Sequence, residues 1–149
     1  MELFFLCLVT FTGCVGYSIH FNIPPRFIPI AALGGTLTYF TYYIMKPYDG
    51  MIACSFFGSV VSSIYAESLA RLLKVPATTF LIISIIPLVP GSNLYHTMEL
   101  CISGEIMDFI AAAIQTLGIA GAIALGILLV SSIFRFITII RRKTVKRAN

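Results

Sequence analysis

The sequence predicts an all-α integral membrane protein with five transmembrane helices, the fourth of which is interrupted at Pro87–Gly91. Hydrophobic residues make up 58% of the chain and charged residues only 11%, whereas about 25% of the residues of a soluble domain are charged. The apolar residues also form long blocks, the pattern of membrane-spanning helices. With 149 residues, the chain fits a single transmembrane domain over residues 1–140 and a basic tail over residues 141–149.

The first predicted span covers residues 3–21, and we expect it to be retained because no basic segment precedes it as in a signal peptide. Two prolines, Pro24 and Pro25, end it, and Arg26 marks a membrane edge. The second span covers residues 27–45. We interpret the tyrosines in its second half and just after it as an interfacial aromatic belt. These are Tyr39, Tyr42, Tyr43 and Tyr48.

The third predicted span covers residues 51–70 and carries an acid near its end, Glu67, four residues before Arg71. An acid and a base at this spacing can pair on one helix face. An acid within a membrane span is also a functional candidate by default. Glu67 is therefore either a structural partner of Arg71 or a proton or cation site.

The fourth predicted span covers residues 77–101 and contains the break. Pro87 and Pro90 each lack a backbone donor, and Gly91 adds backbone freedom. The first half alone is shorter than the roughly 20 residues that a crossing needs. Irregular backbone at membrane depth is tolerated only where protein buries it or where it lines a watery cavity. We therefore expect a site at the break.

The fifth predicted span covers residues 108–140, roughly 50 Å of helix, so we expect its end to project into the cytoplasm. Its one strongly polar residue, Gln115, is interpreted as an interhelical hydrogen-bonding group. Small residues on four spans predict close helix packing. They are Gly13 and Gly16; Ala31, Ala32, Gly34 and Gly35; Gly58, Ser59, Ser62 and Ser63; and Gly118, Ala122 and Gly126.

The basic residues predict an external N-terminus and a cytoplasmic C-terminus, because basic residues favour the cytoplasmic side. With five spans, Arg26, Arg71, Lys74 and the tail fall inside, and only Lys46 falls outside. A re-entrant loop over residues 77–101 would place Arg71 and Lys74 outside, which favours the crossing. The tail predicts contact with lipid headgroups rather than nucleic acid. Its basic residues are Arg141, Arg142, Lys143, Lys146 and Arg147.

The cysteines predict neither a metal site nor a disulfide framework. Cys7, Cys14, Cys54 and Cys101 stand singly, without CxxC spacing, and are interpreted as small hydrophobic residues. We expect no cofactor and no catalytic group. A membrane-embedded enzyme is disfavoured because the sequence has no His/Asp metal cluster, no GxSxG and no phosphate-binding loop.

Three segments together resemble the threonine/serine exporter family, and specifically its small subunit or C-terminal half. They are Ile85-Ile86-Pro87-Leu88-Val89-Pro90-Gly91-Ser92-Asn93-Leu94-Tyr95-His96-Thr97-Met98, Glu67-Ser68-Leu69-Ala70-Arg71-Leu72-Leu73-Lys74-Val75-Pro76-Ala77-Thr78, and Phe21-Asn22-Ile23-Pro24-Pro25-Arg26 with the Ala31–Gly35 patch.

The resemblance implies a multi-pass subunit of the plasma (inner) membrane. The exported substrates that the resemblance implies are threonine and serine, or succinate as in a split bacterial pair. The resemblance also implies a partner, a second five-span subunit that resembles the N-terminal half of the family. Two five-span halves face opposite ways, which is the inverted-repeat arrangement of alternating access. Whether the chain forms homo-oligomers stays open. Among the matched residues, Asn22, Arg26, Glu67 and Arg71 are candidates for ion coupling or gating.

We expect the half-helix that restarts near Ser92 to bind the carboxylate shared by threonine, serine and succinate, because backbone N–H groups and the positive end of the dipole meet there. The candidate substrate-binding residues are Pro90, Gly91, Ser92, Asn93, Tyr95 and Thr97. Ser92 or Asn93 can equally serve as a helix cap. We interpret His96 as an interfacial or packing residue, with proton carriage as the rival interpretation. A non-transporting scaffold or a channel subunit is the alternative function.

Overall fold

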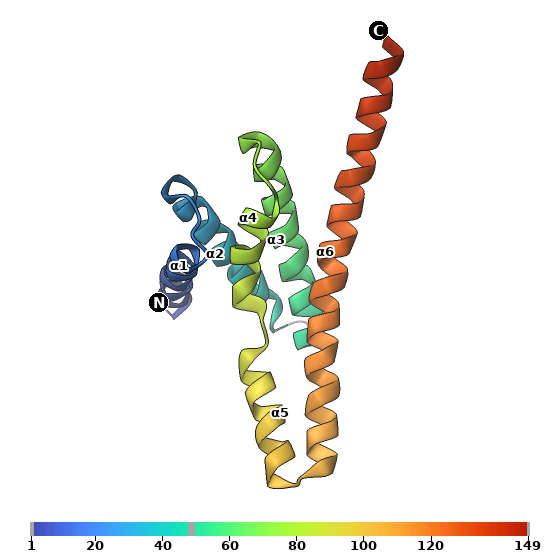
Figure 1. The fold of residues 1–149 in the computed structure, drawn as a ribbon. Helices are drawn as coiled ribbons and strands as arrows, with labels where there is room; N and C mark the ends of the chain where they lie inside the picture. The colour runs from blue at the N-terminus through green and yellow to red at the C-terminus, as the bar shows by residue number, and fades with distance from the viewer. Residues whose placement is uncertain (1, 48–49, 149) are drawn as a thin grey trace.

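The computed structural model describes residues 2–47 and 50–148, which are helical apart from short links (Figure 1). None of these residues is in a β-strand, so the predicted all-α class is confirmed. The described elements are α1 (Glu2–His20), the 3-10 turn η1 (Pro25–Phe27), α2 (Ile28–Met45), α3 (Met51–Leu73), α4 (Thr78–Ile85), the 3-10 turn η2 (Ile86–Leu88), α5 (Gly91–Ser103) and α6 (Ile106–Ala148).

Four helices are long and apolar enough to cross a membrane, and a fifth crossing results if α4 and α5 count as one bent span. The two parts of that pair are bent by 53°. The structure therefore contains four to five candidate spans, in agreement with the coarse prediction. The outward N-terminus and the count of five remain predictions.

The core lies where α1, α2 and α4 meet. Its fully buried members include Ala31 and Ala32 of α2 and Phe80 and Ile83 of α4. The Phe27 and Phe80 rings meet edge to face at 5.7 Å between centroids, a favoured aromatic geometry. The predicted close-packing patch of α2 is confirmed, because a Cβ on Gly34 would overlap the side chains of Ser84 and Tyr65.

A second packed surface, here called the α3–α6 seam, joins α3 to the middle of α6. A Cβ on Gly126 would overlap the Ser59 side chain, and a Cβ on Gly118 would meet Ile52 at 2.8 Å. Ala122 between them is 7% exposed. The predicted small-residue stripe of the fifth span is therefore confirmed. The packing predicted for Gly13 and Gly16 is wrong among the described residues, because a Cβ at either meets nothing within 4 Å.

The turn between α5 and α6 lies far from the α1–α4 bundle. Figure 1 shows α5 and the first part of α6 running side by side below the start of α3. At 43 residues, α6 is longer than the predicted fifth span and continues as helix through the basic tail to Ala148.

Three basic residues near helix ends lie at one end of the bundle. Arg26 lies in η1, Arg71 in the last turn of α3 and Lys74 at its C-cap. The residues that precede η1 line a cavity together with the first residues of α4. The predicted orientation depends on this arrangement, because basic residues favour the cytoplasmic side.

Candidate functional site

The break between α4 and α5 follows from its prolines. Pro87 has no N–H to donate to the carbonyl of Ile83, four residues earlier. The N–H of Ile86 donates to that carbonyl instead, which tightens the chain into η2. Val89 is extended, with φ −60° and ψ 122°, and α5 then begins at Gly91. The predicted interruption is thus confirmed, and the restart falls one residue before Ser92.

The break lies in the middle of the bent pair, between Thr78–Leu88 and Gly91–Ser103, as predicted, but it lies opposite the first half of α3 rather than opposite its centre. Leu88 packs against Gly58, since a Cβ on Gly58 would meet the Leu88 side chain at 3.0 Å. Gly58 is seven residues into α3, roughly 10 Å from Met51. The reason is that α4 and η2 together are shorter than α3, so the chain bends before it has run the full length of that helix.

The first turn of α5 has no side-chain cap. Pro90 occupies the N-cap position, and the N–H of Leu94 donates to the carbonyl of Pro90 at 2.9 Å. Ser92 and Asn93 do not cap the helix; the Ser92 hydroxyl lies 3.5 Å from the side-chain oxygen of Asn93. The capping interpretation of these two residues is therefore wrong. The N–H groups of Ser92 and Asn93 precede the first helical donor and are the ones that helix geometry leaves unpaired.

Beside this first turn is a cavity of about 120 Å³, here called the α5–α6 pocket. Its walls come from α5, the first part of α6 and the start of α3. The lining residues are Met51, Asn93, His96, Ala112, Gln115 and Thr116. Four of these six carry polar side chains, which is unusual for a surface at the edge of apolar helices.

Hydrogen bonds fix the pocket walls. The Gln115 amide donates to the sulfur of Met51 at 3.5 Å, so the interhelical bond predicted for Gln115 is present, with a weak acceptor. Thr116 and Thr97 lie 3.3 Å apart between hydroxyl oxygens. Thr97 also donates to the backbone carbonyl of Asn93 at 2.7 Å. The Thr97–Thr116 contact therefore joins α5 to α6, and the Gln115–Met51 bond joins α6 to α3.

The threonine/serine exporter family model, described as "Threonine/Serine exporter, ThrE", matches residues 6–133. The chain belongs to the threonine/serine exporter family. It is accordingly a multi-pass membrane transporter and not an enzyme. No match is found among the curated proteins or among the solved structures.

The substrate-binding candidates of this exporter are only partly brought together. Asn93 lines the α5–α6 pocket, and the Thr97 hydroxyl donates to the backbone carbonyl of Asn93. Tyr95 is 72% exposed and does not line it. Ser92 and Gly91 are exposed, and Pro90 is half-buried beside the break. A Cβ on Gly91 meets nothing within 4 Å, so the described chain does not require glycine there.

Sequence reasoning did not assign three of the pocket's polar residues to the exporter's site. Those residues are His96, Gln115 and Thr116. The signal for His96 was its position three residues after Asn93, which places the two on one helix face. The signal for Gln115 and Thr116 was their interruption of an apolar run. His96 also lies 3.4 Å from the Glu99 carboxylate, between the ring nitrogen Nδ1 and Oε2.

Glu67 and Arg71 do pair, though loosely. Their closest N–O distance is 3.9 Å, and the Arg71 side chain is 43% exposed. Arg71 also donates to the backbone carbonyl of Phe134 at 2.9 Å and lies 4.9 Å from the centre of its ring. Arg71 therefore fastens the end of α3 to α6. The contacts favour the structural interpretation of the pair, and a proton or cation role for Glu67 remains untested.

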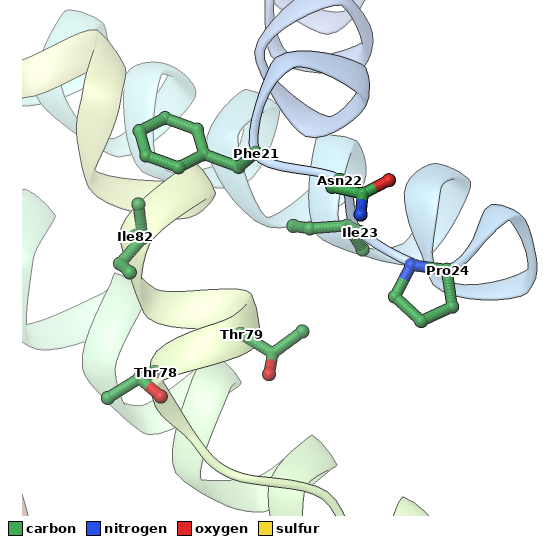
Figure 2. A pocket seen from close by; sticks show the side chains of 7 residues that line it. All are labelled: Phe21, Asn22, Ile23, Pro24, Thr78, Thr79 and Ile82. Carbon is green, nitrogen blue, oxygen red and sulfur yellow. The ribbon is translucent and has the colours of Figure 1, made fainter.

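The other two gating candidates, Arg26 and Asn22, have different surroundings. Arg26 is exposed and its guanidinium lies 4.4 Å from the centre of the Phe27 ring. Asn22 lines a cavity with the start of α4 (Figure 2). That cavity is at the opposite end of α4 from the break.

The chemistry available in the α5–α6 pocket is reversible hydrogen bonding. The backbone N–H groups at the start of α5 can donate to a carboxylate, and the Asn93 and Gln115 amides can donate or accept. No group of three or more potential metal ligands occurs among the described residues. Among the described residues, the Ser92 hydroxyl donates to the side-chain oxygen of Asn93 and not to His96, so the two do not form a nucleophile–base pair. Such a site suits an exporter, which binds and releases its substrate unchanged.

Proposed function

We propose that this chain is one half of a secondary transporter that exports threonine, serine or a related small carboxylate across the plasma membrane. The substrate binds in the α5–α6 pocket, with its carboxylate at the first turn of α5. The observation that carries the proposal is the coincidence of the break, an uncapped helix start and a polar pocket at one place. Family membership supports the class of substrate.

The pocket supports the binding of a small zwitterion. The substrate carboxylate meets the positive end of α5 and the N–H groups of Ser92 and Asn93. Its hydroxyl group reaches the Asn93 or Gln115 amide, and its ammonium meets amide oxygens. A succinate-type dicarboxylate would need a second cationic contact. Neither Arg nor Lys lines the pocket, so among described residues the pocket favours threonine and serine over succinate.

The full transporter includes a second five-span subunit that resembles the N-terminal half of the family. Support comes from the pocket's position, because it lies where α5 and α6 extend beyond the α1–α4 bundle (Figure 1). A partner on that side would complete the enclosure that a transported substrate needs. The expected orientation, N-terminus out and C-terminus in, places the basic tail against anionic headgroups of the cytoplasmic leaflet.

Efflux of labelled threonine, serine or succinate from preloaded cells tests the proposal. The chain is expressed alone and with its candidate partner, with and without a proton uncoupler. We expect efflux of threonine or serine only with both chains and its loss on uncoupling. Uncoupler-insensitive flux that never runs uphill would identify a channel instead.

The pocket is tested in the same cells by Asn93→Leu and Gln115→Leu, which remove hydrogen-bonding groups while keeping a similar volume. Each is expected to lower efflux roughly tenfold or more, since loss of one or two bonds to a charged substrate costs about 1.5–3 kcal/mol each. Tyr95→Phe is the matched control, because Tyr95 is on the same helix but exposed. Normal efflux in correctly inserted Asn93→Leu and Gln115→Leu proteins would contradict the pocket assignment.

A further inference from the structure

At the other end of α4 lies a larger cavity, of about 250 Å³, here called the α4-end cavity. Figure 2 shows Asn22 and Pro24 on one side and Thr78 and Thr79 on the other. The first side is the link between α1 and η1, and the second is the first turn of α4. The lining residues are Phe21, Asn22, Ile23, Pro24, Thr78, Thr79 and Ile82.

The threonines of this cavity differ from the other threonines whose side chains the structure describes. Eight threonine hydroxyls donate to the backbone carbonyl four residues earlier in their own helix. Thr78 and Thr79 form no side-chain hydrogen bond with any described residue, because they open α4 and no helical carbonyl precedes them. The Asn22 amide likewise has no partner among the described side chains and backbone groups. The cavity is thus lined by three polar side chains without a described hydrogen-bond partner, of which Asn22 and Thr78 are exposed and Thr79 is half-buried.

Both walls of the cavity are anchored in the core. Asn22 has a left-handed backbone, with φ 54°, and its N–H donates to the Ile19 carbonyl at 3.0 Å. The next residue, Ile23, is 9% exposed and belongs to the core. On the opposite wall, Phe80 directly follows the two threonines and is 0% exposed. The polar groups therefore project from two fixed elements rather than from a free loop.

The basic residues that neighbour the cavity walls in the sequence favour an anion. Arg26 and Lys74 are exposed and flank the two walls in the sequence, four residues from Asn22 and Thr78 respectively. None of the residues that line the cavity is acidic. A cleft with one sign of charge at its rim raises the local concentration of an oppositely charged ligand.

We propose that the α4-end cavity is a second binding site for the exported carboxylate, occupied before the substrate reaches the α5–α6 pocket. The Thr78 and Thr79 hydroxyls and the Asn22 amide donate to the substrate, and Arg26 and Lys74 attract its carboxylate. The two sites lie at opposite ends of the α4–η2 segment. On the expected orientation, this cavity opens to the cytoplasm, where an exporter loads. The inference rests on the proposed function, since it assumes the same class of substrate.

A cysteine reporter inside the cavity tests this site separately from transport. The background chain carries Cys7→Ser and Cys101→Ser, which leaves only the buried Cys14 and Cys54. In this background, Ile82→Cys is labelled with a maleimide in inside-out membrane vesicles, whose cytoplasmic face is exposed to the medium. We expect threonine or serine to slow the labelling several-fold. Leu72→Cys is the control reporter, because Leu72 is 77% exposed at the same end of the bundle but outside the cavity. Its labelling should not change.

Three variants then assign the protection to the cavity. Thr78→Val and Thr79→Val keep the side-chain shape and remove the hydroxyl; each is expected to raise the substrate concentration for half-protection roughly two- to tenfold. Thr41→Val, at an exposed threonine of α2 whose hydroxyl is bonded to Leu37, should leave it unchanged. Gln115→Leu should lower efflux roughly tenfold or more while protection at Ile82→Cys persists.

The outcomes separate this inference from the proposed function. Efflux without any protection at Ile82→Cys would overturn the second site and leave the exporter intact. Protection that disappears in Gln115→Leu would also overturn it, because a single site would then account for both results. Absence of efflux for all three substrates would overturn the proposed function, whereas protection under those conditions would still support a carboxylate site here.

Discussion

The α3–α6 seam and the break between α4 and α5 both contain glycine and small polar residues, yet these residues serve opposite purposes. In the seam, Gly126 lets two backbones approach so closely that a Cβ would overlap Ser59. At the break, a Cβ on Gly91 meets nothing. The seam is therefore a fixed joint made by close packing. The break is an open segment made by proline, and it lies beside the polar pocket.

The largest effect is expected when the break is made continuous. Pro87→Ala together with Pro90→Ala restores two backbone donors and permits α4 to run on into α5. Since a proline inside a helix costs about 3 kcal/mol, its removal favours the straight form, and efflux should fall at least roughly tenfold. Efflux from the preloaded cells and thermal stability of the purified protein are the measurements.

Gly91→Ala is the matched control for that experiment, because it changes a neighbouring residue without restoring a donor. We expect nearly normal efflux from it. If the double alanine variant transports normally while folding normally, the bend is not needed for function and the comparison above fails.

An intermediate effect is expected from overpacking the seam. Gly126→Val should destabilise the protein by about 1–3 kcal/mol, because Phe56 and Ser59 must shift. Gly13→Val is the same change on α1, where the space is open. The thermal midpoint of each detergent-solubilised variant, followed by size-exclusion chromatography, measures the difference. Equal midpoints for the two variants would show that the seam is looser than the structure indicates.

The smallest effect is expected at the far end of the seam. Arg71→Ala removes the bond to the Phe134 carbonyl and the contact with its ring. At a site this exposed, the loss should be about 1 kcal/mol or less. Glu67→Gln should change stability still less and leave the pH dependence of efflux unaltered. A shifted pH profile in Glu67→Gln would instead identify Glu67 as the proton site.

The fold could be predicted from the sequence wherever a residue has the same structural effect in every context. Pro87 and Pro90 lack a donor in any context, so the break could be located to within a residue. The stripe of Gly118, Ala122 and Gly126 also predicted its packing, since its spacing gives one helix face. Gly13 and Gly16 are also small residues on one helix, but a Cβ on either meets no described atom within 4 Å. Which of several small-residue faces is used depends on the arrangement of the other helices.

The site was less predictable for the same reason. Asn93 was identified because it opens a half-helix, but its pocket partners Gln115 and Met51 come from other helices. Tyr95, two residues after Asn93, was predicted to bind and is exposed. The helical turn of 3.6 residues places neighbours in sequence on different faces, and only the three-dimensional structure shows which face meets α6.

The length of α6 has a mechanical consequence. Its 43 residues make a rod of roughly 65 Å, and it packs tightly against α3 at Gly126, between the two ends. A rod that tilts about such a fulcrum carries its ends in opposite directions. Any rocking that widens the gap between Gln115 and α5 would swing the basic end of α6 the other way. If lipid headgroups hold that end, as proposed above, they would resist the opening of the pocket.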